Sequence, residues 1–516
     1  MDANADIDAN IGANNIGQIF MLAWTIYLSF LGVLVLMLMP RDKPHAARVI
    51  ALASALAGLV AGVVGVMHHP DLNQYETVVQ KDWIRGLHIQ YFLGADGISL
   101  VLVLLTGIAA VTGILFSWNI EMRTKEFFAY YLALIGSVYG VFLSFDVFLL
   151  FVFYELAIIP KYFLIAIWGS TRREYGAMKL ALYSFIGSAM VLVGIVAAYV
   201  KAGATTTSLI ELAKFPFPES FQYWAFPLVF IGFAILAGLW PFHTWAPTGH
   251  VAAPTAASML LAGVVMKLGA YGALRVAMTL FPLGLEAWRN EIGLLAVIGI
   301  VYGATVALVQ KDFKFVIGYS SVSHMGFVLL GLVTINTIGL SGAVLQMFSH
   351  GIIAGLLFAV VGRMVYDRTH TRDLDELEGM NLGRALPFAA GTFAIAGFAS
   401  MGLPGFSGFV AELQVLIGAW QAFPTFAVAA GLGILVGVAY TLRALQKAFY
   451  GEGGTESKTE HEAHPLPPIS LPERIGAVVL IATTLVIGLY PKLLLDLITP
   501  SFSLSLFDGL LRKGGM

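Results

Sequence analysis

The stretch "LWPFHTWAPTGHVAAPTAAS", residues 239–258, separates two long apolar segments of the chain. It places three prolines, Pro241, Pro247 and Pro254, where those segments meet. Proline removes a backbone donor and interrupts the helical hydrogen-bond ladder, so freed carbonyl groups must be satisfied by polar side chains or water. Inside a membrane, such backbone is tolerated only where it is buried in protein or lines a cavity. The stretch therefore predicts a broken transmembrane helix in the protein interior.

The composition of the whole chain indicates an integral membrane protein. Of its 516 residues, 58% are hydrophobic and 12% are charged, and the mean hydropathy is +0.83, whereas soluble domains carry about a quarter charged residues. The net charge of -2 gives no electrostatic footprint for nucleic acid. The chain has no cysteine, which excludes disulfides, thiolate catalysis and cysteine-bound zinc or iron–sulfur clusters on this chain. Any redox chemistry is therefore expected in a partner.

A window of about 20 residues, the length that crosses a hydrocarbon core, predicts about fourteen transmembrane helices. The predicted spans are 17–39, 46–67, 97–117, 128–145, 147–168, 180–200, 226–247, 253–280, 291–309, 314–334, 338–365, 386–418, 424–449 and 474–493. Lys and Arg gather in alternate loops, such as "RDKPHAAR" and "STRREYGAMK", which the positive-inside rule places in the cytoplasm. We therefore expect both termini outside.

A second break is predicted in "FASMGLPGFSGFVAELQVLIG", where two glycines flank Pro404. Interrupted helices in corresponding places of two five-helix blocks are typical of an inverted repeat. The predicted organisation is residues 1–127 with helices 1–3, 128–280 with helices 4–8 and a break near 236–250, 291–450 with helices 9–13 and a break near 402–408, and 451–516 with a cytoplasmic loop and the last helix. The fold class is thus an all-α membrane protein with two inverted five-helix repeats.

Three charged residues stranded in apolar sequence are the main candidates: Glu155 in the fifth predicted span, Lys267 in the eighth and Glu412 in the twelfth. A charge at mid-bilayer costs about 2.5–3.5 kcal/mol, so each needs a partner, a water-filled cavity or a neutral protonation state. A proton path has the same requirements, and we interpret the three as proton-exchanging groups. The alternatives are a structural, hydrogen-bonded acid at Glu155 or Glu412, and a Lys267 ammonium that extends to the membrane surface.

Histidines add candidates for the same path. His324 and His350 lie in adjacent spans beside serines that can hold water, and imidazole relays protons near neutral pH. The alternative for both is a packing role between helices. His243 and His250 resemble a metal pair, but they lack a third ligand nearby. Since the chain also lacks nucleotide-binding and HExxH motifs, we expect it to bind neither metal nor cofactor.

The chain carries a known family pattern from about residue 90 to 450, and four motifs define it: "YELAIIPKYFLIAIWG", "WPFHTWAPTGHVAAPTAASMLLAGVVMKLGAYGALR", "QKDFKFVIGYSSVSHMGFVLLG" and "GLPGFSGFVAELQVLIG". Together they resemble the antiporter-like membrane-arm subunits of NADH:quinone oxidoreductase (complex I), and the subunit M family in particular. The resemblance implies a fourteen-helix fold in which Glu155 pairs near the seventh helix. It also implies that Lys267 and the histidines form a central polar axis, and that Glu412 ends this axis near the next subunit. The implied partners are antiporter-like neighbours on both sides and subunits that carry FMN, iron–sulfur clusters and the quinone site.

The sequence departs from this family at the seventh helix. Family members usually carry a lysine five residues before the proline that corresponds to Pro241 and an aspartate after the next one, whereas this chain has Leu236 and Thr248. We expect Lys161, one and two-thirds turns beyond Glu155 on the same helix, to replace the missing cation in part. His243 and His250 are the next candidates for this role. The alternative is that Lys161 extends to the cytoplasmic headgroups.

The expected function is that of a proton-translocating subunit of a complex I-like enzyme. It would couple quinone reduction elsewhere in the complex to proton pumping through buried Glu, Lys and His side chains. The expected location is the bacterial cytoplasmic (inner) membrane, where lipid surrounds the chain. One alternative is a subunit of a multi-subunit Na+/H+ antiporter. The other is a non-pumping structural subunit of the membrane arm, for which the missing lysine is the best argument.

Overall fold

The computed structural model of the chain describes residues 21–69, 72–451 and 466–511. Two predictions lie partly outside these residues: the start of the first span at residue 17, and most of the cytoplasmic loop that begins at residue 451.

The N-terminal part consists of three long helices and a β-hairpin. Its elements are α2 (Met21–Leu38), α3 (Pro44–Met67), β1 (Glu76–Ile84), η1 (Arg85–Leu87), β2 (Ile89–Ala95) and α4 (Gly97–Phe116). The strands pair antiparallel, with Gln80 opposite Phe92. The prediction of an all-α fold missed this hairpin because strands of nine and seven residues are too short for a 20-residue hydropathy window. Asp96 caps α4, because its carboxylate accepts a hydrogen bond from the Ser99 amide at 2.9 Å.

The next part contains the first helix break. Its elements are α5 (Thr124–Leu143), α6 (Val147–Leu156), α7 (Ile158–Trp168), α8 (Arg173–Lys201), α9 (Leu209–Lys214), α10 (Glu219–Ala237), η2 (Phe242–Thr244), α11 (Trp245–Ala252), α12 (Thr255–Leu260), η3 (Leu261–Val265), α13 (Met266–Gly272) and η4 (Ala273–Met278). Helix α10 ends where Gly238 adopts a left-handed conformation, φ +89°. The indole of Trp245 donates to the Ile235 carbonyl in the last turn of α10 at 2.8 Å. The Gly238 amide donates to the same carbonyl at 3.1 Å, so the end of α10 is fixed by both groups.

The remaining part contains the second break. Its elements are α14 (Pro282–Val309), α15 (Phe313–Val333), α16 (Thr337–Phe358), η5 (Ala359–Tyr366), α17 (Asp367–Thr369), α18 (Leu374–Glu378), α19 (Leu382–Ala385), α20 (Pro387–Ser400), α21 (Ser407–Ala422), α22 (Pro424–Leu445), η6 (Gln446–Tyr450), α23 (Leu471–Leu489), α24 (Lys492–Ser501), η7 (Ser505–Phe507) and α25 (Asp508–Leu511). Gly402 and Gly405, at φ +73° and +101°, make the turn between α20 and α21. Only glycine adopts such backbone readily.

The number of spans agrees with the predicted fold class. In the described residues, 13 helices are long and apolar enough to cross a membrane, and a bent C-terminal pair that starts with α24 raises the number to 14. The predicted twelfth span is instead two helices, α20 and α21, of 14 and 16 residues. The chain is therefore a multi-pass helical membrane protein. The inverted relation of the two blocks remains a prediction.

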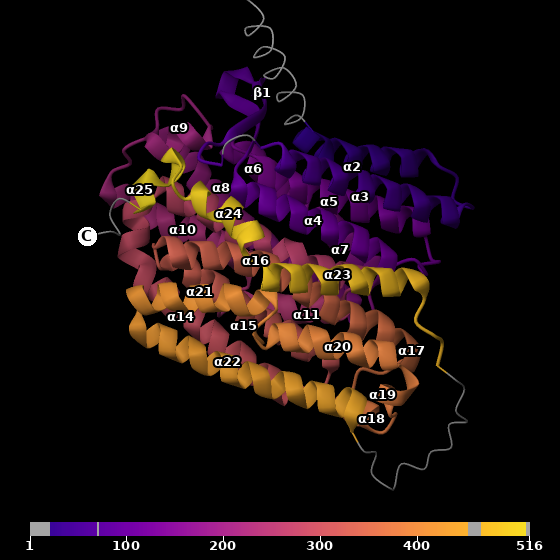
Figure 1. The fold of residues 1–516 in the computed structure, drawn as a ribbon. Helices are drawn as coiled ribbons and strands as arrows, with labels where there is room; N and C mark the ends of the chain where they lie inside the picture. Colours follow the sequence, from indigo (N-terminus) through magenta and orange to yellow (C-terminus); the bar gives the residue numbers. More distant parts are fainter. Residues whose placement is uncertain (1–20, 70–71, 452–465, 512–516) are drawn as a thin grey trace, which may run out of the picture.

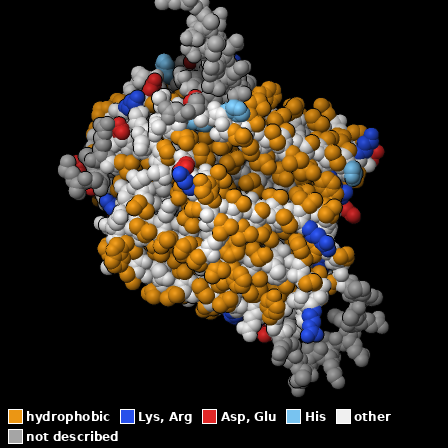
Figure 2. Space-filling model, in the orientation of Figure 1, with side chains coloured by type: hydrophobic (Ala, Val, Ile, Leu, Met, Phe, Trp, Pro, Cys, Tyr) orange, Lys and Arg blue, Asp and Glu red, His pale blue; other side chains and the backbone are white. Residues whose placement is uncertain are grey.

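The long helices lie side by side, with α2 and α3 at one edge of the bundle and α22 at the opposite edge (Figure 1). Helix α23 packs against α4, α16 and α21. It therefore connects the N-terminal helices with helices that follow the first break. The face seen in Figure 2 is covered mainly by hydrophobic side chains, and most charged groups lie near its margins. This distribution fits a surface that faces lipid.

Gly97, at the start of α4, packs closely against the backbone of another helix. A Cβ at this position would lie 1.7 Å from the carbonyl oxygen of Leu497 in α24. We therefore expect Gly97→Ala to lower the free energy of unfolding in detergent by about 1–3 kcal/mol, because α24 must move away. The matched control is Gly391→Ala, whose Cβ meets no atom within 4 Å and which should keep or raise the stability. Equal stability of the two variants would contradict this contact.

Candidate functional site

A line of buried polar side chains crosses the interior from α13 through α16 and α15 to α21. Lys267 Nζ lies 2.7 Å from His350 Nδ1 and also donates to the Ala262 carbonyl. The rings of His350 and His324 have centroids 5.4 Å apart, and His324 Nδ1 lies 2.8 Å from Glu412 Oε1. We call Lys267, His350, His324 and Glu412 the polar line. The structure thus brings four predicted site residues together.

The helix irregularities position both ends of the polar line. Lys267 follows the π-helical turn η3, whose wider backbone leaves the Ala262 carbonyl free for the ammonium. Since Lys267 is fully buried, the alternative that its ammonium extends to the membrane surface is wrong. At the other end, the break before α21 lets Ser400 Oγ contact His324 Nε2 at 3.1 Å. His324 is therefore held between Ser400 and Glu412.

A small cavity lies beside the polar line. It is lined by His324, Gln346, His350 and Glu412 among others, and its volume of ≈ 10 Å³ is about that needed for one water. Gln346 Nε2 donates to Glu412 Oε1 at 3.2 Å, whereas His350 Nε2 is buried without a protein partner. A buried polar atom of this kind usually bonds an ordered water. The cavity can thus hold a water that joins the two imidazoles.

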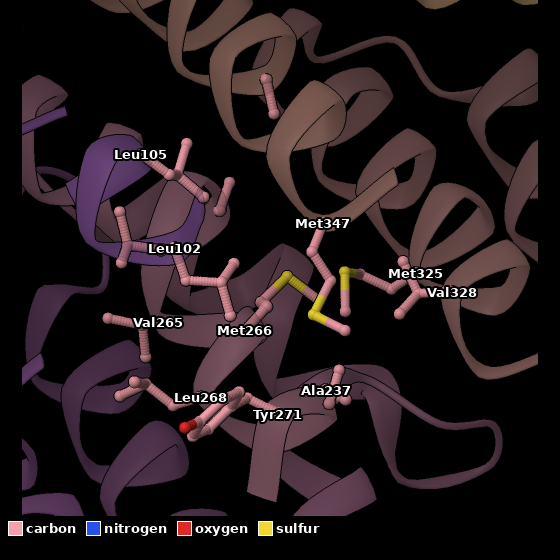
Figure 3. Close-up of a cluster of buried hydrophobic side chains, with 14 of the residues drawn as sticks. Leu102, Leu105, Ala237, Val265, Met266, Leu268, Tyr271, Met325, Val328 and Met347 are labelled. Atoms are coloured by element: carbon pink, nitrogen blue, oxygen red, sulfur yellow. The ribbon is translucent and has the colours of Figure 1, made fainter. Parts of the chain in front are cut away.

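Three methionines pack next to the polar line. Met266, Met325 and Met347 are fully buried, and Figure 3 shows their side chains meeting between the helices that carry Lys267, His324 and His350. Flexible thioether side chains fill irregular gaps well. These methionines exclude bulk water from the side of the polar line on which they pack.

Glu155 lies outside the polar line, on α6 near the break at Ala157. It is half-buried, and its Oε1 has no hydrogen-bond partner. It interacts with Ser188 of α8 and, electrostatically, with Lys161. The buried ammonium of Lys161 makes no hydrogen bond.

Lys161 faces the interior of the protein. It is 1% exposed and shares a buried face of α7 with Ile158, Leu164 and Ile165, as the helical period requires. The alternative that it extends to the headgroups is therefore wrong. The alternative rested on the short distance from Lys161 to the end of the helix. It did not take into account that Lys161 lies on the buried face of α7.

The two histidines of the opening stretch have other neighbours. His243 packs against Tyr302, with ring centroids 5.2 Å apart, and His250 against Phe358 at 5.0 Å. Both rings are buried, and all four nitrogens lack hydrogen-bond partners. In the described residues, no group of three or more His, Asp or Glu side chains is arranged to hold a metal ion.

Sequence reasoning missed other buried charges. Arg275 and Asp96 form an ion pair whose side chains are both 0% exposed, although Arg275 lies inside a predicted span and two turns after Lys267. Lys314 is buried at the start of α15, but as the first residue of the predicted span 314–334 it was not considered a site residue. The signal was available for both, since each lies within or directly beside apolar sequence.

A many-helix membrane protein with an interior line of ammonium, imidazole and carboxylate groups belongs to the class of antiporter-like membrane subunits. Residues 144–437 match the family described as "NADH:quinone oxidoreductase/Mrp antiporter, TM". NADH-quinone oxidoreductase subunit M of Rhodobacter capsulatus is 40% identical over 438 residues, which are 82% of this chain and 83% of that protein. Subunit M of Rickettsia prowazekii (strain Madrid E) is 35% identical over 92% of this chain and 96% of its own length. The chain therefore belongs to the subunit M family of NADH-quinone oxidoreductase.

Solved structures agree with this assignment. A chain of respiratory complex I from Thermus thermophilus with bound NADH has a TM-score of 0.84 and 27% identity, and the match covers 94% of this chain and 99% of that one. A chain of the Mrp complex from Dietzia sp. DQ12-45-1b has a TM-score of 0.79 at 21% identity, covering 96% and 99%. The second likeness shows a shared fold alone.

Proposed function

We propose that the chain is the proton-translocating M subunit of a bacterial NADH-quinone oxidoreductase in the cytoplasmic membrane. The observation that carries this proposal is the polar line, in which Lys267, His350, His324 and Glu412 follow one another at hydrogen-bond or ring-contact distance. Relatives named NADH-quinone oxidoreductase subunit M match this chain over most of their length, which supports its assignment to that enzyme complex. Flavin, iron–sulfur clusters and quinone belong to partner subunits in this proposal, with antiporter-like subunits on both sides.

The polar line moves a proton by successive protonation of neighbouring groups. The Lys267 ammonium releases a proton to His350 Nδ1, 2.7 Å away, which leaves a neutral amine and an imidazolium. The imidazolium passes a proton to His324, directly or through a water in the small cavity. His324 then protonates the Glu412 carboxylate across 2.8 Å. His350 and His324 return to their neutral forms as each passes its proton on. Lys267 regains its charge when it takes up the next proton, and the Glu412 carboxyl releases its proton before the next transfer.

Different observations support the two alternative functions, a Na+/H+ antiporter subunit and a non-pumping structural subunit. A Na+/H+ antiporter subunit is supported by the family description and by the fold of the Mrp complex, but the relatives that cover most of the chain are named NADH-quinone oxidoreductase subunits. A non-pumping structural subunit is supported by Leu236 in place of the family's lysine. Copurification with flavin-containing, NADH-oxidising subunits tests the first alternative, and proton pumping tests the second.

The isolated chain is expected to oxidise no NADH and reduce no quinone in liposomes. The chain has no cysteine to hold an iron–sulfur cluster and no glycine fingerprint for a dinucleotide. The assay compares the purified chain with the whole complex, both supplied with NADH and a soluble quinone. Reductase activity that purifies with the isolated chain would contradict the proposed division of labour.

A further inference from the structure

The side-chain amide of Gln346 lies at the last step of the polar line. Its Nε2 is 3.2 Å from Glu412 Oε1 and 3.5 Å from His324 Nδ1. These two atoms are 2.8 Å from each other, and all three side chains line the same small cavity. Because the two atoms are so close together, a single N–H of the amide can be shared between them. Gln346 thus contacts both groups between which the proposed transfer runs.

The packing of α16 against α21 holds the Gln346 side chain in this place. Gln346 is 1% exposed. One turn earlier on α16, a Cβ at Gly342 would lie 2.8 Å from the Val415 amide nitrogen of α21, so the two helices are in close contact. Gln346 Oε1 is buried without a hydrogen-bond partner, a cost that an apolar side chain of similar size would avoid. Packing alone therefore does not account for an amide at this position.

The other polar side chains around the pair have different partners. Ser400 Oγ contacts the opposite ring nitrogen, His324 Nε2, at 3.1 Å, and Ser400 also hydrogen-bonds Tyr440. The Tyr440 hydroxyl lies 2.6 Å from Ser320 Oγ. Among the residues that the structure describes, no other side chain donates to both His324 Nδ1 and Glu412 Oε1. The amide of Gln346 is therefore the group placed to act on both atoms.

The pair needs such a donor when it holds no proton. If Ser400 accepts the Nε2 proton, the neutral His324 ring presents the Nδ1 lone pair to Glu412. After Glu412 has lost its proton, this lone pair and a carboxylate oxygen face each other across 2.8 Å. Two acceptors at this distance repel each other, which favours keeping a proton between them. An N–H shared by both offsets the repulsion, and hydrogen bonds to an ionised carboxylate are among the strong ones.

We propose that Gln346 is a positioning residue that stabilises the proton-empty form of the His324–Glu412 pair and so allows Glu412 to release its proton. This inference rests on the proposed function. When the His324 imidazolium protonates Glu412, its Nδ1–H bond breaks, an O–H bond forms, and both groups become neutral. The O–H bond then breaks, its proton passes to water beyond the polar line, and a carboxylate remains. Gln346 loses no proton in these steps, and no electron is transferred.

Time-resolved infrared difference spectroscopy of the assembled complex after a pulse of NADH separates uptake from release. The carboxylic carbonyl band of Glu412, assigned by its loss in Glu412→Gln, rises as the proton arrives and decays as it leaves. Gln346→Met keeps the length of the side chain but removes the donor. We expect an unchanged or faster rise and a decay slowed at least about tenfold, as for loss of a hydrogen bond to a charged group. Gln346→Leu should behave in the same way.

Gln414→Met is the matched control. Gln414 lies on α21, and its amide oxygen is also buried without a hydrogen-bond partner. The same substitution there removes an amide beside the polar line without touching the His324–Glu412 pair. Rise and decay of the Glu412 band should both remain at the wild-type rates.

The outcomes distinguish this inference from the proposed function. A wild-type decay in Gln346→Met or Gln346→Leu would overturn the role of Gln346 in proton release and leave the polar line intact. A rise and a decay that are slowed equally would also overturn it, because the substitution would then merely have displaced the pair. If the Glu412 band does not change even in the wild-type complex after the pulse, the proposed function itself fails.

Discussion

Lys267→Ala is expected to lower proton pumping by the assembled complex by roughly 100-fold or more, the effect of removing an essential acid–base group. Lys267 is the first member of the polar line, and its ammonium contacts His350 at 2.7 Å. Without it, His350 has no proton donor on that side. Pumping is measured as acidification of proteoliposomes per NADH oxidised.

Two controls accompany this prediction. Lys267→Met fills more of the side-chain volume and should show the same loss, which separates proton transfer from the cost of a cavity. Glu412→Gln keeps shape and hydrogen-bonding capacity, so a purely structural acid should tolerate it, whereas a proton acceptor should not. Coupled pumping at the wild-type level in assembled Lys267→Met complex would contradict the relay.

Lys161→Met is expected to impair pumping about as severely as Glu155→Gln. Lys161 is buried, has no hydrogen-bond partner, and acts electrostatically on Glu155. We propose that in this chain Lys161 replaces, in part, the lysine that family members usually carry at the position of Leu236. The matched control is Ile159→Met on the same helix, whose side chain is 53% exposed and which should pump normally.

A rescue experiment gives this prediction its sharpest form. Leu236 is buried in α10. Helices α10 and α8 are in close contact nearby, because a Cβ at Gly187 of α8 would lie 2.5 Å from the Gly232 carbonyl oxygen and 3.5 Å from Ile235 Cβ, both of α10. Residue 236 follows Ile235 on α10, and Ser188, which interacts with Glu155, follows Gly187 on α8. Leu236→Lys is expected to restore pumping in the Lys161→Met background. Normal pumping by Lys161→Met alone, or no rescue by the added lysine, would contradict the compensation.

Sequence reasoning predicted the membrane fold because its signals are local. Apolar length defines the spans, and the prolines and glycines near 241 and 404 mark breaks that the structure places at residues 238–241 and 401–406. The same reasoning found the four residues of the polar line, since a charge or imidazole in apolar sequence is conspicuous.

The resemblance to the family implied a central polar axis, but the contacts between those residues could not be predicted from the residues themselves, because they depend on packing between distant helices. Nothing local to Lys267 indicates contact with His350, 83 residues away. The sequence does not indicate that Lys161 lies on the buried face of α7, because both faces of this helix are apolar. Lys314 was overlooked because it lies beside loop charges, although it enters the interior at the start of a helix.

The measurement that tests the central claim most directly is infrared difference spectroscopy of the assembled complex during turnover, with the carboxylic carbonyl band assigned by its loss in Glu412→Gln. If protons travel along the polar line, the wild-type complex shows protonation of Glu412 during turnover. The same band should disappear in Lys267→Met, although Glu412 and its 2.8 Å contact with His324 remain. A Glu412 band of unchanged size in Lys267→Met would show that its protons come by another route, and would contradict the account.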